Sequence, residues 1–244
     1  MSFTVFENET LEDLQINNLF LIQKKDAFRF GMDAVLLANF ARAKPGSKVI
    51  DLGTGTGIIP LLLSTKTKAK SIMGIEIQPE IAEMAERSVQ GNGLSDRIQI
   101  QKFDIRECRQ KLSTVFDVVV TNPPYTKIGG GIVNPMETKA MARHEILCTL
   151  SDVIRTASEL LKYHGEFYMV HRPDRLCDIM VEMRSFKLEP KELRLVCPRE
   201  GETPSLILIK GLNKGNAGMK LLPPLNIYDV NGNYSDETRI YYER

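Results

Sequence analysis

An amide, two prolines and a phenol stand together at Asn122-Pro123-Pro124-Tyr125, directly after the apolar run at residues 116–120. An exocyclic amine on a nucleobase is a poor nucleophile because its lone pair is delocalised into the ring. The side-chain oxygen of Asn122 and the carbonyl of Pro123 can each accept one N–H of such an amine, which favours a pyramidal nitrogen. These bonds strengthen as positive charge builds on the nitrogen, so they stabilise the transition state selectively. The tetrapeptide therefore indicates transfer of a group to a planar nitrogen.

The other residues of the turn suit the same chemistry. Pro123 and Pro124 stiffen the backbone and remove two N–H donors that would compete for the acceptors. Tyr125 offers a face on which a planar group can stack, worth about 1–3 kcal/mol for a base. No general base is required, because the proton can leave after transfer. A plain Asn-Pro turn after a strand is the alternative, and the glycine loop upstream argues against it.

That upstream loop contains Gly53, Gly55 and Gly57 and follows a second apolar run, with Asp51 just before it. A dinucleotide site has the spacing G-x-G-x-x-G, and here Ile58 takes the place of its third glycine. A nicotinamide oxidoreductase is therefore disfavoured. The same strand-turn-helix geometry can bring backbone close to an adenosyl-amino-acid, which has no phosphate to bind. Asp51 can then receive the ammonium of the amino acid, directly or through water.

Two further carboxylates end the next two predicted strands. Glu76 can take both hydroxyls of a ribose, and Ile77 beside it belongs to the same predicted site. Asp104 can accept the amino group of an adenine, with Ile105 packing on the ring. A single acidic residue is more often a helix cap or part of a solvated turn. The ordered set predicts S-adenosylmethionine as the cofactor, with Asn122 bordering both the cofactor and the acceptor.

The elements that must position these residues form an alternating pattern from residue 47 to about 211. Short apolar runs alternate with helical periodicity, which is typical of an α/β domain with a mostly parallel sheet. The last two predicted strands have no convincing helix between them, which indicates an antiparallel hairpin at one sheet edge. Predicted strands are 48–50, 71–77, 97–103, 116–121, 165–170, 192–197 and 205–210, and predicted helices are 31–40, 57–65, 79–90, 151–163 and 173–183.

The composition is that of an ordinary globular protein, with 244 residues, 43% hydrophobic residues and a net charge of +1. The start of the chain lacks the basic and apolar regions of a signal peptide, and no apolar run is long enough to span a bilayer. We therefore expect a cytoplasmic protein without membrane contact, and the oligomeric state stays open. The cysteines and histidines lack metal-ligand spacing, so we expect no metal and reduced thiols. These residues are Cys108, Cys148, Cys177, Cys197, His144, His164 and His171.

The order of motifs from the glycine loop to Asn122–Tyr125 resembles the class I S-adenosylmethionine-dependent methyltransferases that act on exocyclic or amide nitrogens. More narrowly, the chain from about Leu19 to Lys210 is similar to the bacterial tRNA1(Val) adenine-N6 methyltransferases, which modify the adenine just 3′ of the anticodon. The resemblance implies a Rossmann-like, seven-stranded sheet with the last strand antiparallel. It also implies that Gly31 and Asp33 lie over the methionine end of the cofactor. The segments that carry it, besides the two motifs, are 28–37, 142–145 and 202–209.

This interpretation predicts that the chain has three parts. We expect an N-terminal extension packing on the core (1–45), a methyltransferase domain (46–212) and a C-terminal tail (213–244) that is a small hairpin or disordered. The segment 127–143 contains three consecutive glycines and predicts a mobile loop beside the Asn122–Tyr125 turn. Long irregular loops of this kind are often functional lids or binding loops.

An RNA substrate, tRNA or another structured RNA, needs a basic surface near the turn, because phosphate contacts dominate nucleic-acid affinity. The target base must also leave its stack to reach Tyr125. About half of such scattered basic residues are expected to lie on a solvent-exposed face without any role in binding. The predicted substrate-binding residues besides Tyr125 are Lys127, Lys139, Arg143 and Arg172, and further candidates are Arg175, Arg194 and Arg199.

Three other functions stay open. A guanine-N2 in rRNA is a close competitor, because the turn does not exclude it. A glutamine amide in protein is the substrate of the release-factor methyltransferases, which share the turn. Those enzymes usually carry an N-terminal helical domain, and about forty residues are too few for one here. A fold that binds the cofactor and RNA without catalysis is disfavoured by the intact turn.

Overall fold

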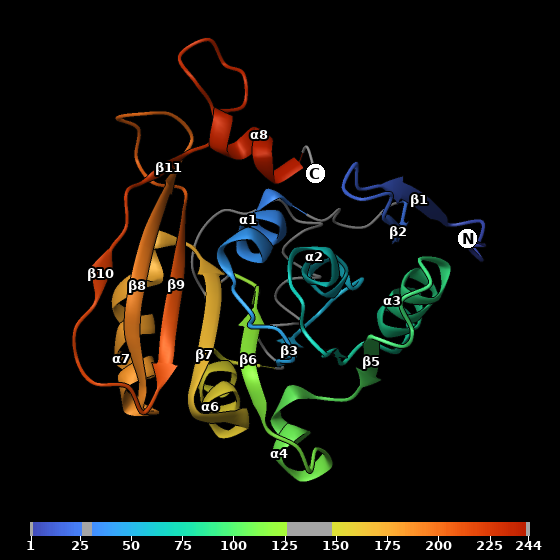
Figure 1. Ribbon diagram of the computed structural model, residues 1–244, viewed down its shortest axis with the longest axis horizontal. Coiled ribbons are helices and arrows are strands. Elements are labelled where there is room, and N and C mark those ends of the chain that lie inside the picture. Colours follow the sequence, from blue (N-terminus) through green and yellow to red (C-terminus); the bar gives the residue numbers. More distant parts are fainter. Residues whose placement is uncertain (1, 26–30, 126–147, 243–244) are drawn as a thin grey trace.

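The computed structural model describes residues 2–25, 31–125 and 148–242 of the chain (Figure 1). The predicted loop at 127–143, with Lys127, Lys139 and Arg143, therefore lies entirely outside the described residues. So do His144 and residues 28–30 of the segment that carries the family resemblance.

A mostly parallel sheet forms the centre of the molecule (Figure 1). Within the described ranges it has nine strands, in the order β10-β8-β9-β7-β6-β3-β4-β5, and β11 also pairs with β8. Strand β9 runs antiparallel to both β7 and β8. The predicted α/β fold, with its last long strand antiparallel, is confirmed. The seven long strands are β3 (Lys48–Leu52), β4 (Ser71–Glu76), β5 (Ile98–Lys102), β6 (Phe116–Thr121), β7 (Leu161–His171), β8 (Leu188–Cys197) and β9 (Leu206–Asn213).

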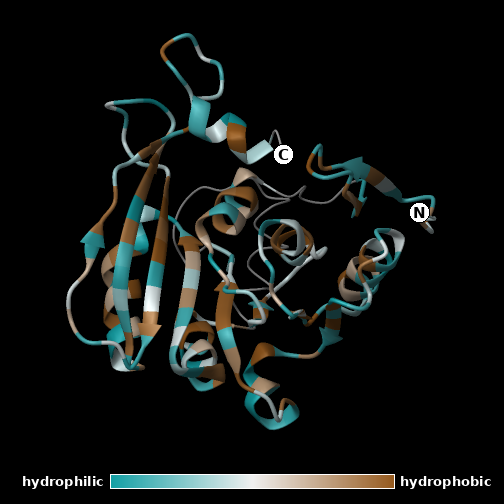
Figure 2. Cartoon of the chain, in the orientation of Figure 1, coloured by the Kyte–Doolittle hydropathy of each residue, from teal (hydrophilic) through white to brown (hydrophobic). Residues whose placement is uncertain are grey.

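Helices cover both faces of the sheet because its inner strands are apolar on both sides. On β6, Val118 and Val120 pack with one group of helices and Val119 with the other. Figure 2 shows the hydrophobic colouring on these strands and on the helices against them. No helix in the described part of the chain is long and apolar enough to cross a bilayer. One face holds α1 (Met32–Phe40), α2 (Ile58–Lys66) and α3 (Pro79–Gly91), and the other holds α4 (Cys108–Lys111), α6 (Leu150–Leu160) and α7 (Leu176–Ser185).

The first residues form a small antiparallel sheet, β1 (Glu9–Asp13) with β2 (Phe20–Lys24), that the sequence analysis did not predict. Strand β2 binds α3 through its backbone, since the Ile22 amide donates to Ser88 Oγ at 3.0 Å. The ion pair between Arg87 and Glu9, at 2.6 Å, joins α3 to β1.

The tail has more structure than the expected hairpin or disordered segment. Two-residue strands, β10 (Lys220–Leu221) and β11 (Leu225–Asn226), pair with β8, and Tyr228 bridges to Tyr234. A final helix, α8 (Asp236–Tyr242), is tied to β8 by the ion pair of Arg194 with Glu237 at 2.6 Å. Arg194, a candidate for RNA contact, is thus engaged within the fold.

The predicted helix at 151–163 extends too far. Helix α6 ends at Leu160, because Leu161 pairs with Phe116 of β6 and begins strand β7. His164, expected near a helix end, lies inside β7 with a φ of 59°. Pairing along the sheet outweighs the local helical periodicity here.

Candidate active site

The glycine loop and the Asn122–Tyr125 turn leave the sheet side by side. Strands β3 and β6 are parallel neighbours, and Leu52 of β3 pairs with Thr121 of β6. Gly53 and Asn122 are therefore the first residues after the two paired strand ends. The Thr121 hydroxyl donates to the Leu52 carbonyl at 2.9 Å in a buried position and fixes the two strand ends together. The carboxyl ends of parallel strands thus bring the two motifs to one edge, where ligands bind in open α/β sheets.

The glycine loop has a backbone that other residues adopt at a cost. Gly53, Gly55 and Gly57 have φ values of +77°, +56° and +88°, all in the left-handed region. The amides of Gly53 and Thr54 both donate to the Ile75 carbonyl, at 3.0 and 2.8 Å, which anchors the loop on β4. Helix α2 begins directly after it, at Ile58.

Asp51 is fully buried, and neither of its carboxylate oxygens has a hydrogen-bond partner among the described residues. Burial raises the pKa of Asp51 to about 7; the nearby Thr54 hydroxyl opposes this rise in part, and the charge of Glu76 adds to it. No hydrogen bond of normal geometry joins Thr54 to Asp51, so the threonine does not satisfy the carboxylate. Since an unpaired buried carboxylate is costly, Asp51 is suited to a cationic ligand.

Glu76 is held by the backbone on both sides. Its Oε2 accepts from the Gly55 amide at 3.0 Å, and its Oε1 accepts from the Gln78 amide at 2.9 Å. Each oxygen keeps a further lone pair, which a hydroxyl can use. The half-buried Ile77 follows directly after β4. The carboxylate is therefore oriented at the edge of the glycine loop.

Sequence analysis missed Gly74, which pairs with Asp51 across β3 and β4. A Cβ at Gly74 would lie 2.8 Å from Oγ1 and Cγ2 of Thr54, so only glycine leaves room for that side chain. A glycine inside a strand is the signal that could have found it, because it marks a close approach of other atoms.

Replacing Gly74 with alanine is expected to destabilise the protein by overpacking, at about 1–3 kcal/mol. For a chain of this size the melting temperature should fall by roughly 2–10 °C. Differential scanning fluorimetry measures this shift, and Ser71→Ala at the start of the same strand is the control. An unchanged melting temperature for Gly74→Ala would show that Thr54 can move freely.

Asp104, the predicted adenine contact, caps a short 3-10 turn (Ile105–Glu107) in this structure. Its Oδ1 accepts from the Arg106 amide at 2.9 Å, and its Oδ2 from Arg106 Nη2 at 2.5 Å. Partial burial opposes the effect, but the hydrogen bonds and charge of Arg106 hold the pKa of Asp104 below its ordinary value. Ile105 is 8% exposed and packs with the apolar cluster on the α6 side.

Tyr125 joins the turn to the start of α1. Its hydroxyl lies 2.7 Å from Asn122 Oδ1 and 2.7 Å from Asp33 Oδ2. Gly31 precedes α1 and leaves room for this carboxylate, since a Cβ there would lie 2.6 Å from Asp33 Oδ1. Burial, and then the charge of Asp33, raises the pKa of Tyr125, so the phenol keeps its proton.

His171 is the last residue of β7, beside the turn, and Arg172 follows it. The His171 ring lies 5.1 Å from the Tyr125 ring, and the Arg172 guanidinium lies 5.5 Å above that ring. Burial, and then the charge of Arg175, lowers the pKa of His171 to about 4, so this histidine is neutral near pH 7. Its Nδ1 accepts from the Arg172 amide at 2.8 Å, so the proton is on Nε2. Sequence analysis considered His171 only as a metal ligand and found no ligand spacing for it; here the ring packs on Tyr125.

The remaining basic candidates pair with local carboxylates. Arg175 lies 2.9 Å from Asp178, and Arg199 lies 3.3 Å from Glu202. Among the predicted cations that the structure describes, Arg172 lies over the Tyr125 ring. Arg175 lines a small pocket together with Pro123 and Pro124 of the turn.

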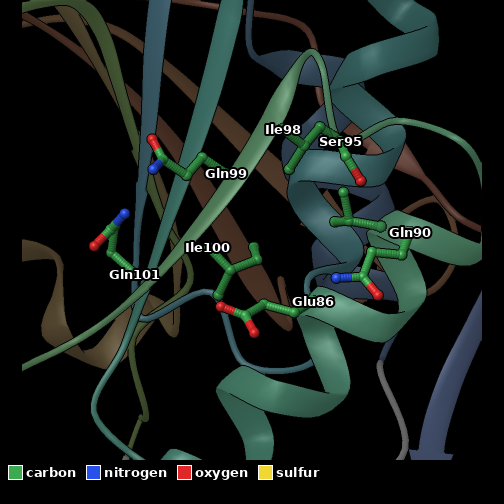
Figure 3. Close-up of a pocket in the computed structure, with 8 residues that line it drawn as sticks. Glu86, Gln90, Ser95, Ile98, Gln99, Ile100 and Gln101 are labelled. Atoms are coloured by element: carbon green, nitrogen blue, oxygen red, sulfur yellow. The ribbon is translucent and has the colours of Figure 1, made fainter.

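A shallow hollow of about 320 Å³ lies between α3 and β5, away from all predicted site residues (Figure 3). Ile98 and Ile100 point from β5 toward the helix, while Gln99 and Gln101 point to the other side (Figure 3). We assign it no part in the chemistry. In residues 2–25, 31–125 and 148–242, no group of three or more His, Cys, Asp or Glu side chains could hold a metal ion.

Comparison with known proteins agrees with this geometry. Residues 30–184 match the methyltransferase small domain family. A Porphyromonas gingivalis protein named tRNA1(Val) (adenine(37)-N6)-methyltransferase is 34% identical over 189 residues, 75% of this chain and 73% of that protein. A protein of the same name from Bacteroides thetaiotaomicron is 29% identical over 221 residues, 89% of this chain and 92% of that one.

Among solved structures, the Agrobacterium tumefaciens protein Atu636, described as a predicted O-methyltransferase, has a TM-score of 0.71. It is 23% identical, over 86% of this chain and 95% of that one, and shows the shared fold. The chain belongs to the methyltransferase small domain family and is a methyltransferase.

Proposed function

We propose that the protein transfers a methyl group from S-adenosylmethionine to N6 of an adenine in tRNA. The observation that carries the proposal is the pairing of Leu52 with Thr121, which sets the glycine loop beside Asn122. The name tRNA1(Val) (adenine(37)-N6)-methyltransferase, shared by relatives that are 27–34% identical, supports tRNA as the substrate class. A cytoplasmic location follows from that substrate.

The residues around the glycine loop fit the cofactor. S-adenosylmethionine supplies an electrophilic methyl group on a sulfonium. Asp51 has a buried carboxylate that lacks a hydrogen-bond partner in the described part of the chain, and the ammonium of the methionine part would satisfy it. Glu76 is oriented to accept from the ribose hydroxyls. Asp104, together with Ile77 and Ile105, would contact the adenine.

The cofactor's other neighbours come from the loop and from α1. Gly53, Gly55 and Gly57 let the backbone approach without a side chain in the way. We place Gly31 and Asp33 at the methionine end because Asp33 reaches the Tyr125 hydroxyl, beside Asn122.

At the acceptor, Asn122 Oδ1 and the Pro123 carbonyl would each accept one N–H of the adenine amine. Both bonds strengthen as the nitrogen becomes positive, so they lower the barrier selectively. Tyr125 would stack on the flipped base, and the turn would position it for an in-line displacement. The proton leaves afterwards, so the neutral His171 is not needed as a base.

Arg172 is the described cation best placed to bind RNA. Replacing Arg172 with alanine should weaken tRNA binding at low salt and reduce the slope of log K against log salt by about 1. Affinity for S-adenosylmethionine should stay unchanged. Fluorescence anisotropy across a salt series measures the slope, with the exposed Arg109 on α4 replaced by alanine as the control. Equal slopes for Arg172→Ala and wild type would exclude a phosphate contact.

Transfer of label from S-adenosylmethionine to three substrates tests the proposed substrate class. Unmodified tRNA, rRNA and a release factor are incubated separately with the full chain, and the products are digested and separated. Label in tRNA as N6-methyladenosine supports the proposal. Label in N2-methylguanosine of rRNA, or in glutamine, would replace the substrate while keeping the mechanism.

A further inference from the structure

The hydroxyl of Tyr125 has more acceptors than protons. It lies 2.7 Å from Asp33 Oδ2 and 2.7 Å from Asn122 Oδ1. A phenol carries one hydrogen, and its buried setting beside Asp33 keeps that hydrogen on the oxygen. Two oxygen acceptors cannot both receive it at full strength, so one of these contacts needs another proton.

Charge decides which oxygen receives the phenol proton. Hydrogen bonds to an ionised acceptor are roughly twice as strong as neutral ones. Asp33 lies in the first turn of α1, where the helix dipole favours negative charge, and its Oδ1 accepts from the Ala34 amide at 2.9 Å. The phenol therefore donates to Asp33 and turns its lone pairs toward Asn122.

The side chain of Asn122 can supply the missing proton. A turn of 180° about its last bond exchanges Oδ1 and Nδ2 with no change of shape. The Nδ2–H then donates to the Tyr125 oxygen, and every group in the chain Asp33–Tyr125–Asn122 is satisfied. In this arrangement Oδ1 points away from Tyr125.

We propose that Asp33 is a positioning residue that acts through Tyr125 to set the orientation of the Asn122 amide. The proposal rests on the proposed function, in which Asn122 Oδ1 accepts an N–H of the substrate amine. With Asp33 in place, Oδ1 faces the amine. Without it, the phenol donates to Oδ1, and Nδ2 faces the amine as a second donor with nothing to accept.

Neighbouring residues hold the hydrogen-bonded side chains of Asp33, Tyr125 and Asn122 in place. The Tyr125 ring packs on neutral His171 and lies under Arg172, at 5.1 and 5.5 Å. Gly31, which has no Cβ, leaves the space that the Asp33 carboxylate occupies, since a Cβ there would lie 2.6 Å from Asp33 Oδ1. The hydroxyl of Tyr125 thus lies between two residues, Asp33 and Asn122, that belong to different elements.

A double-mutant cycle tests the coupling in the full-length chain. Asp33→Asn and Tyr125→Phe should each lower kcat for tRNA methylation by on the order of 10–10²-fold. The double variant should be no slower than the slower single variant, because both substitutions interrupt the same series of hydrogen bonds. The dissociation constant for tRNA should stay within about twofold of wild type in both single variants, and so should that for S-adenosylmethionine in Tyr125→Phe. Controls are Tyr163→Phe, 69% exposed, and Asp96→Asn, also exposed.

Side-chain amide NMR gives a second measurement that does not need activity. In the ¹⁵N-labelled protein the Asn122 Nδ2–H resonance should be shifted and protected from solvent exchange, and Tyr125→Phe should abolish both. If wild type shows this signature but methylates no RNA, the proposed function fails while the amide orientation stands.

Two results would overturn the inference. One is a cycle in which the losses in kcat multiply. The other is an Asn122 resonance that Tyr125→Phe leaves unchanged. Melting temperatures within a few degrees of wild type would show that the variants fold.

Discussion

Replacement of Asn122 with alanine is expected to abolish measurable methyl transfer while S-adenosylmethionine still binds. Loss of one preorganised hydrogen-bond partner of a transition state costs about 10²–10³-fold in kcat. Here the loss is larger still, because the amide also satisfies the Tyr125 hydroxyl, 2.7 Å away. The cofactor contacts assigned to Asp51 and Glu76 lie on neighbouring strands and do not depend on this side chain.

Single-turnover transfer to tRNA measures the chemical step, and isothermal titration measures cofactor binding. Asn216→Ala, at an exposed position in the tail, is the matched control. More than a tenth of wild-type activity in Asn122→Ala would contradict the assigned mechanism. Loss of cofactor binding together with activity would instead show that Asn122 holds the cofactor as well as the acceptor.

Replacement of Asp51 with asparagine should weaken cofactor binding and stabilise the cofactor-free protein. Truncating one partner of a buried charge pair costs about 2–5 kcal/mol, so the dissociation constant for S-adenosylmethionine should rise by on the order of 10²-fold. In the free protein the carboxylate is fully buried and has no partner within residues 2–25, 31–125 and 148–242, so its removal relieves a cost.

The stabilisation should depend on pH. Burial raises the pKa of Asp51 from 3.8 to about 7, so between these values the folded state binds a proton that the unfolded chain does not. Stability of the wild type therefore falls as pH rises from about 4 to about 7, and levels off above that. Asp51→Asn removes this loss. It should raise the melting temperature most at pH 8 and little at pH 4, with a gain on the order of a few kcal/mol.

Thermal unfolding at pH 4, 6 and 8 without cofactor measures this effect, and Asp96→Asn at an exposed site is the control. A melting temperature for Asp51→Asn below that of wild type at pH 8 would show that the carboxylate is already satisfied in the fold. An unchanged dissociation constant would remove Asp51 from the cofactor site. Residues that bind a ligand often destabilise the ligand-free protein, which is a common trade-off between stability and activity.

The sheet and the two main motifs could be predicted because local signals define both. The predicted strands 48–50 and 116–121 end directly before Asp51 and Asn122, and parallel strands bring such ends to one edge of the sheet. The contact of Tyr125 with Asp33 could not be found this way. It joins residues 92 positions apart, and no periodicity links them.

Sequence analysis missed other features of the structure, each for a different physical reason. Strands β10 and β11 have two residues each, too short for any alternation to show. From the sequence, Arg194 was predicted to be a surface cation. In the structure it forms an ion pair with Glu237 of α8, which the sequence pattern does not reveal. Gly74 carried a usable signal, because a strand interior rarely holds glycine without a close neighbour.

The most direct measurement is methyl transfer from labelled S-adenosylmethionine to an unmodified tRNA1(Val) transcript, followed by nucleoside analysis. The account predicts label in N6-methyladenosine, and none in a transcript with guanine in place of the adenine 3′ of the anticodon. Equal label in the two transcripts, or label in a methylguanosine, would contradict adenine N6 at that position as the acceptor. No label in any RNA or protein, with the cofactor bound, would contradict catalysis itself.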